Sequence, residues 1–145
     1  MPFPGSAAAP VSTLRTPRGE LVIRTIAMPA NTNAAGDIFG GWLMTEMDLG
    51  GAILAHQTSR SRVTTVAVDA MEFHRPVLVG DTVACFAELL RVGRTSMRIK
   101  IEVWVQRHIE NTQECVTEAV FTYVALGENG RPQLVHHEGN PAPTG

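Results

Sequence analysis

Hydrophobic residues recur at two different spacings along the chain, and the spacing separates one long helix from a set of strands. The segment Glu20–Met28 is rich in β-branched residues and is followed by Pro29, which favours a strand. The stretch from Ile38 to about Thr58 is apolar on most sides and rich in small residues. That pattern predicts a long and mostly buried helix.

Four further apolar runs follow this helix and have the composition of strands. They are Val63–His74, Thr82–Leu90, Ser96–His108 and Glu114–Leu126. The third run alternates: Met97, Ile99, Ile101, Val103 and Val105 face one way, and Arg98, Lys100, Glu102 and Gln106 face the other. One buried face and one wetter face indicate an antiparallel sheet.

The order of one strand, one long helix and four antiparallel strands predicts an α+β fold. Because a single helix cannot cover both faces of a five-stranded sheet, we expect the sheet to wrap around the helix. Residues 19–127 are expected to form one domain, between a flexible arm at residues 1–18 and a flexible tail at residues 128–145. His136 and His137 in this tail are expected to be solvated, because no cysteine or acidic cluster accompanies them.

Two glycine pairs lie in the predicted helix, although glycine inside a helix costs roughly 0.5–1 kcal/mol relative to alanine. Gly50 and Gly51 lie in its middle, where we expect them to allow close packing of strands. Gly40 and Gly41 lie near its start, where unpaired N–H groups and the helix dipole can polarise a carbonyl oxygen. Asp37, just before this pair, is either an N-cap or a catalytic carboxylate.

Composition limits the classes of function. The 145 residues are 44% hydrophobic and 18% charged, with a net charge of −2, so we expect a globular protein that does not bind nucleic acid. No segment approaches the roughly 18 apolar residues of a membrane span, and the N-terminus lacks the pattern of a signal peptide. We therefore expect a cytoplasmic protein in which Cys85 and Cys115 are reduced. No metal site is expected.

A combination of motifs carries a resemblance to a known family. The pattern N-x-x-G-[DN]-x-x-G-G ends at Gly41 and is followed by Asp48, then by F-x-x-P-x-x-x-G-D and by G-R-T-S. Together these motifs resemble the hot-dog-fold acyl-CoA thioesterases, most closely the bacterial YciA-like group, over roughly Glu20 to Leu126. The resemblance implies hydrolysis of acyl-CoA in a hot-dog fold, with catalytic roles for Asp37 and Asp48. It also implies active sites shared across a dimer, assembly as a trimer of dimers (a hexamer), and no cofactor, since coenzyme A is part of the substrate.

The residues themselves are compatible with thioester hydrolysis. This reaction needs an activated water or a carboxylate nucleophile, together with stabilisation of the oxyanion. The thiol leaving group needs little acid help, because its pKa is only about 8.5. No G-x-S-x-G sequence is present, which disfavours a serine esterase.

The spacing of the two aspartates bears on assembly. If one helix contained both Asp37 and Asp48, they would lie about 16 Å apart, too far to touch one thioester. We therefore expect them to meet across a two-fold dimer. A structural role for Asp48, hydrogen-bonded to the backbone or to a threonine, is the alternative.

Coenzyme A also carries phosphates that require cations. The resemblance selects the turn of the G-R-T-S motif, because related enzymes contact coenzyme A there. Asp69 is expected to be structural. The candidate contacts for coenzyme A are Arg62, Arg75, Gly93, Arg94, Thr95 and Ser96.

Two other functions stay open. One is a non-catalytic protein that binds or senses acyl-CoA. The other is a hot-dog hydratase or dehydratase, which needs a histidine close to its aspartate, and the sequence around Asp37 contains none.

Overall fold

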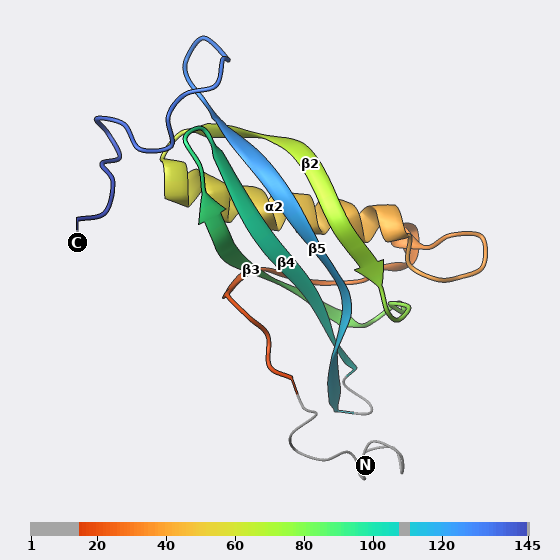
Figure 1. Cartoon of the computed structure of the whole chain (residues 1–145). Helices are drawn as coiled ribbons and strands as arrows, with labels where there is room; N and C mark the ends of the chain where they lie inside the picture. Colours follow the sequence, from red (N-terminus) through yellow and green to blue (C-terminus); the bar gives the residue numbers. More distant parts are fainter. Residues whose placement is uncertain (1–14, 108–110, 145) are drawn as a thin grey trace.

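The computed structural model describes residues 15–107 and 111–144, so most of the expected N-terminal arm lies outside the described residues. The predicted order of one strand, one long helix and four strands is confirmed (Figure 1). A short 3-10 helix before the long helix was not predicted. The elements are β1 (Glu20–Ile26), η2 (Pro29–Asn31), α2 (Gly40–Ser59), β2 (Arg62–Phe73), β3 (Thr82–Val92), β4 (Ser96–Arg107) and β5 (Thr112–Leu126).

The five strands form one antiparallel sheet in the order β1-β3-β4-β5-β2, which places β4 at its centre and β2 at one edge. The helix lies across one face of this sheet and contacts all five strands (Figure 1). The prediction that the sheet wraps around one helix is therefore confirmed.

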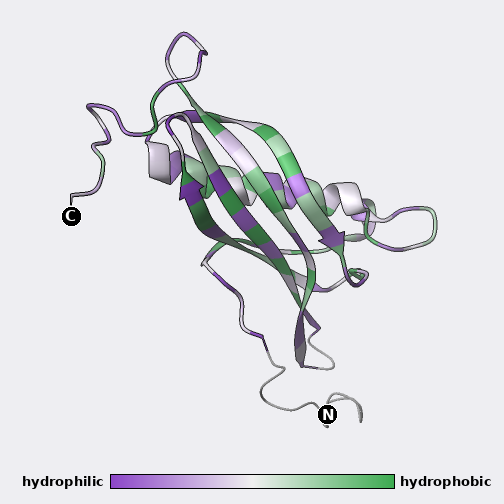
Figure 2. Cartoon of the chain, viewed as in Figure 1, coloured by the Kyte–Doolittle hydropathy of each residue, from purple (hydrophilic) through white to green (hydrophobic). Residues whose placement is uncertain are grey.

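The central strand β4 differs in part from the predicted alternation of buried and wet faces. Its apolar face is fully buried against the helix, as predicted, and hydropathy alternates along the strands (Figure 2). The opposite face is drier than predicted, since Glu102 and Trp104 are only 1% and 4% exposed. Arg15 covers this face: its Nη2 donates to Glu102 Oε2 (2.8 Å), and its guanidinium lies over the Trp104 ring. A charged residue in an alternating pattern therefore did not mark a solvated position.

The segment after residue 127 differs from the flexible tail that the sequence predicts. Its residue Val135 is fully buried, and the Val135 N–H donates to the carbonyl of Arg94 (2.8 Å). The Nε2 atom of His137 lies 2.9 Å from the carbonyl oxygen of Ser59 at the end of α2. Packing therefore continues well beyond residue 127, because the backbone groups at the end of the helix find their partners in this segment.

The second glycine pair lies where the helix approaches the sheet most closely. A Cβ atom on Gly50 would lie 2.8 Å from Val22 Cγ2, and one on Gly51 would lie 2.6 Å from Ile101 Cδ1 and would also overlap the hydroxyl of Tyr123. These distances are too short for carbon atoms in contact. The predicted packing role of this pair is therefore confirmed.

We expect Gly51→Ala to destabilise the fold, whereas Gly41→Ala does not. A methyl group on Gly51 would overpack the interface between helix and sheet, which typically costs about 1–3 kcal/mol in unfolding free energy. A methyl group on Gly41 would meet nothing within 4 Å. Chemical denaturation of both variants checks this; a Gly51→Ala protein as stable as the Gly41→Ala protein would contradict it.

Candidate active site

The helix α2 begins without a capping side chain. Its N-cap residue is Phe39, which cannot supply a side-chain hydrogen bond, so the interpretation of Asp37 as the N-cap is wrong. The loop before the helix is instead held by Asn33, whose Oδ1 accepts hydrogen bonds from the N–H groups of Ala35 (2.9 Å) and Asp37 (3.1 Å). The carboxylate of Asp37 is exposed and makes no hydrogen bond within the described residues.

The first glycine pair leaves this helix start open. The first N–H groups with a carbonyl partner in the helix are those of Trp42 and Leu43, which both donate to the carbonyl of Phe39 (3.1 and 3.3 Å). The N–H groups of Gly40 and Gly41 precede them. Since neither glycine has a side chain to shield these groups, the positive end of the helix dipole is accessible to a polarised oxygen.

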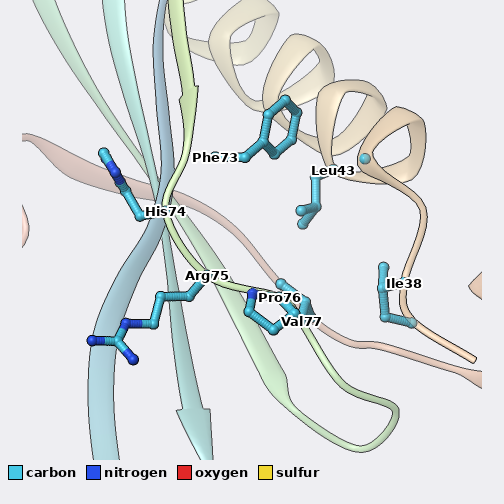
Figure 3. A pocket seen from close by; sticks show the side chains of 8 residues that line it. Ile38, Leu43, Phe73, His74, Arg75, Pro76 and Val77 are labelled. Atoms are coloured by element: carbon cyan, nitrogen blue, oxygen red, sulfur yellow. The ribbon is translucent and has the colours of Figure 1, made fainter.

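A pocket of about 410 Å³ lies beside this helix start. It is bounded by Gly40 and by the chain that connects β2 to β3. Figure 3 shows Ile38, Leu43 and Phe73 on its apolar walls, whereas the side chains of His74 and Arg75 point away from them.

A second pocket, of about 380 Å³, lies between the helix and the strands β2 and β5. Asp48 is its only carboxylate and is half-buried. The hydroxyl of Thr65 donates a hydrogen bond to Asp48 Oδ1, and the hydroxyl of Tyr123 donates to the backbone carbonyl of Asp48 (2.8 Å). The pocket is lined by Gly41, Met44, Thr45, Asp48, Leu49, Thr65, Val68 and Phe121.

Thr65 and Tyr123 are site residues that the sequence analysis did not identify. Thr65 lies on the same face of β2 as Val63, and a threonine at such a position is common in strands. The feature of the sequence that could have identified Thr65 is its hydroxyl group at a position where β2 faces the helix. The hydrogen bond from Thr65 fits both interpretations of Asp48, because a carboxylate held by a threonine can be structural or catalytic.

Only one of the two aspartates lies in the helix. The helix starts at Gly40, so Asp37 lies outside it, and the estimate of about 16 Å along one helix does not apply. From Gly40 to Asp48 the helical rise is still about 12 Å. This rise exceeds the size of one thioester carbonyl, although Gly41, the second residue of the helix, lines the same pocket as Asp48.

The candidate contacts for coenzyme A fall into two groups at opposite ends of the helix. Arg75 borders the pocket beside Gly40, and its Nε lies 3.4 Å from Glu114 Oε2. The turn that contains Arg94 contacts the C-terminal segment, which in turn packs on the last residues of the helix. In this turn Gly93 N–H donates to Ser96 O (2.8 Å), and Thr95 O accepts from Ala125 N–H (2.8 Å); the side chains of Arg62 and Arg94 are exposed.

Two further sets of ionisable side chains among the described residues form ion pairs. Asp69 pairs with Arg98 on the surface (3.5 Å). His74 Nε2 lies 2.9 Å from Glu118 Oε2. Burial alone would raise the pKa of Glu118, but hydrogen bonds from His74 and Lys100 outweigh it and lower that pKa below its ordinary value.

Neither cysteine is suited to be a nucleophile. Burial, with a smaller contribution from Glu46, raises the pKa of the Cys85 thiol to about 12. Burial, with Glu102, raises that of Cys115 to about 11. Both thiols are therefore protonated at neutral pH.

Within residues 15–107 and 111–144, no group of three or more His, Cys, Asp or Glu side chains is placed to hold a metal ion. Across the same part of the chain, no helix is both long and apolar enough to cross a membrane.

Comparison with known proteins identifies close relatives. Residues 35–110 match the thioesterase superfamily. The acyl-CoA thioester hydrolase YciA of Salmonella typhimurium is 53% identical over 127 residues, which cover 86% of this chain and 96% of the relative.

Solved structures give the same picture. A hexameric broad-specificity acyl-coenzyme A thioesterase superposes with a TM-score of 0.81 and 51% identity, covering 87% of each chain. A hexameric thioesterase from Yersinia pestis superposes with a TM-score of 0.78 and 54% identity, covering 83% of this chain and 98% of its own.

Proposed function

The chain belongs to the thioesterase superfamily, and on that premise we propose that it hydrolyses acyl-CoA to free coenzyme A and a carboxylic acid. The observation that carries this proposal is that Gly41, at the uncapped helix start, lines the same pocket as the half-buried carboxylate of Asp48. These are the two groups that thioester hydrolysis requires.

Two carboxylates are proposed to serve each site. Both oxygens of Asp37 are free of hydrogen bonds within the described residues, so it can act as a general base or as a nucleophile. Asp48, fixed by Thr65, supplies the second carboxylate from the partner subunit of a two-fold dimer. The helical rise of about 12 Å between Gly40 and Asp48 of the same chain supports this sharing.

The proposed chemistry balances without any cofactor. With the aspartate as base, a water molecule loses a proton to the carboxylate and its oxygen attacks the thioester carbon. The N–H groups at the start of the helix stabilise the negative charge that develops on the carbonyl oxygen. The bond between carbon and sulfur then breaks, and the coenzyme A thiolate leaves and takes up the proton that the carboxylate accepted from water, which restores the carboxylate.

The surface of the chain supports a second copy as the partner. Met44, Leu49 and Val68 line the pocket around Asp48 and are 40%, 54% and 38% exposed. Strand β2 forms an unpaired edge of the sheet next to this pocket. Because a related thioesterase of 51% identity is hexameric, we extend the proposal to a trimer of dimers.

Both cysteines are unpaired, which is compatible with the reducing cytoplasm.

The hydratase alternative is disfavoured by the position of His74. His74 lines the pocket beside the helix start, but its ring points away from Ile38, Leu43 and Phe73 (Figure 3). Its Nε2 lies 2.9 Å from Glu118 Oε2 instead. An assay of thiol release from acyl-CoA distinguishes a hydrolase from a protein that only senses acyl-CoA.

Release of free thiol from acyl-CoA tests the proposal directly. We expect the purified protein to release coenzyme A, and we expect Asp37→Ala and Asp48→Ala to lose at least 100-fold in kcat, on the order of the effect of removing one essential catalytic group. Asp69→Asn is the matched control, because Asp69 is an exposed aspartate paired with Arg98. Tight binding of acyl-CoA without thiol release would identify a sensor instead.

Complementation tests the sharing of sites. When the inactive Asp37→Ala and Asp48→Ala chains are unfolded, mixed and refolded, a mixed dimer has one site with both carboxylates and one with neither. Random mixing then returns roughly a quarter of wild-type activity. If mixed dimers form and no activity returns, the shared site is excluded.

The turn of the G-R-T-S motif is proposed to bind the phosphates of coenzyme A. We expect Arg94→Ala to raise KM for acyl-CoA about tenfold, in line with the loss of one charge-assisted contact. KM for a short thioester that lacks the nucleotide should not change. Arg98→Ala, on the neighbouring strand, is the control. An equal effect of Arg94→Ala on both substrates would remove Arg94 from the coenzyme A site.

A further inference from the structure

A half-buried guanidinium lies at the end of the central strand, outside both pockets. The side chain of Arg107 is 18% exposed, and it makes three polar contacts with described residues. Its Nη2 donates to the carbonyl of Pro76 (2.9 Å) and lies 3.3 Å from Asp81 Oδ2, while its Nη1 pairs with Glu114. Two of these three contacts go to the connection between β2 and β3, residues 74–81.

This connection reaches the start of the helix through one backbone hydrogen bond. Asp81 Oδ2 also accepts the N–H of Leu78 (2.9 Å), so the carboxylate paired with Arg107 holds the turn together. The carbonyl of Val77, which is fully buried, accepts the N–H of Ile38 (3.2 Å). Ile38 directly precedes the N-cap residue of the helix. Figure 3 shows Pro76, Val77 and Ile38 on the wall of the pocket next to the helix start.

We propose that Arg107 is a positioning residue for the active site. It fixes residues 76–81, and the hydrogen bond between Ile38 and Val77 passes this constraint to the N–H groups of Gly40 and Gly41. The inference rests on the proposed function, in which those N–H groups stabilise the oxyanion. A displacement of about 1 Å in such a group can cost up to about 100-fold in rate.

Stability alone gives a weak reason for such a residue. Removing a charged group from water is costly, and well-packed apolar residues often stabilise a fold at least as well as a buried ion pair does. The Nε atom of Arg107 is buried without a hydrogen-bond partner in the described structure, which adds to the cost. What a guanidinium provides instead is a rigid, planar fork that holds a carbonyl and a carboxylate in fixed relative positions.

Kinetics of Arg107→Gln and Arg107→Lys test the proposal. We expect kcat for acyl-CoA hydrolysis to fall about tenfold or more in Arg107→Gln, with KM within about twofold of wild type, because Arg94, which is proposed to bind coenzyme A, lies near the opposite end of the helix. Arg107→Lys keeps the charge opposite Asp81 but not the fork, so its kcat should lie between the two. If the glutamine variant does not fold, the lysine variant decides the test. Arg98→Gln, an exposed cation on the same strand, is the matched control.

Hydrogen exchange separates positioning from general destabilisation. In Arg107→Lys the amide of Ile38 should exchange faster than in the wild type, while the amide of Ile101 in the core of the same strand should be unchanged. Faster exchange at both amides, or a kcat equal to that of wild type, would overturn the proposal. Should the wild type release no thiol at all, the proposed function fails, and the exchange of Ile38 still shows whether Arg107 holds the helix start.

Discussion

The close approach of one helix to the centre of a curved sheet is the constraint on which the rest of the structure depends. Gly50 and Gly51 allow this approach, because any side chain there would overlap Val22, Ile101 or Tyr123. The cost of glycine in a helix, roughly 1 kcal/mol for each residue, is offset by this burial. The position of the helix axis then determines where its open start meets solvent, whereas its last residues are covered by the C-terminal segment.

Both proposed catalytic features follow from that position. The hydroxyl of Tyr123 reaches the backbone carbonyl of Asp48 only because Gly51 has no side chain. The packing of the second glycine pair therefore also fixes the position of Asp48 relative to the sheet. Thr65 then orients the side chain of Asp48 from the neighbouring strand. At the start of the helix, the first glycine pair leaves the positive end of the helix dipole exposed. The connection between β2 and β3, which Arg107 contacts, is proposed to fix the position of this helix start. One glycine pair thus serves packing and the other is proposed to serve chemistry.

Periodicity was sufficient for the elements of the fold because the sequence alternates cleanly where the sheet faces the helix. It was insufficient where polar side chains find partners from distant parts of the chain. Glu102 is buried because Arg15 covers it and Trp104 donates to it, and Val135 is buried where its N–H donates to the carbonyl of Arg94. The contacts of Arg15 with Glu102 and of Val135 with Arg94 join residues that lie far apart in sequence, and a local pattern contains no information on them.

In the candidate site, too, some residues can be found from the local sequence and others only from their contacts in the fold. The glycine pairs and Asp48 could be found from the sequence, since glycine pairs and a carboxylate are unusual in a buried helix, and Asp37 could be found by its place just before the first pair. Thr65, Tyr123 and Arg107 could not be found, because a threonine or tyrosine in a strand and an arginine at its end are common. Only the contacts of these three residues distinguish them: a hydroxyl on Asp48, a hydroxyl on its backbone, and a guanidinium on Pro76.

A crystal structure with an unreactive acyl-CoA analogue, in which a CH₂ group replaces the thioester sulfur, tests the arrangement of the site most directly. The analogue keeps the carbonyl group that the helix start is proposed to polarise. Its carbonyl oxygen should lie about 2.7–3.1 Å from an N–H group of Gly40 or Gly41 of one subunit. The carboxylate of Asp48 from the partner subunit should face the same carbonyl carbon. A carbonyl group bound away from the helix start, or next to Asp48 of the same chain that supplies the glycines, would contradict the shared site.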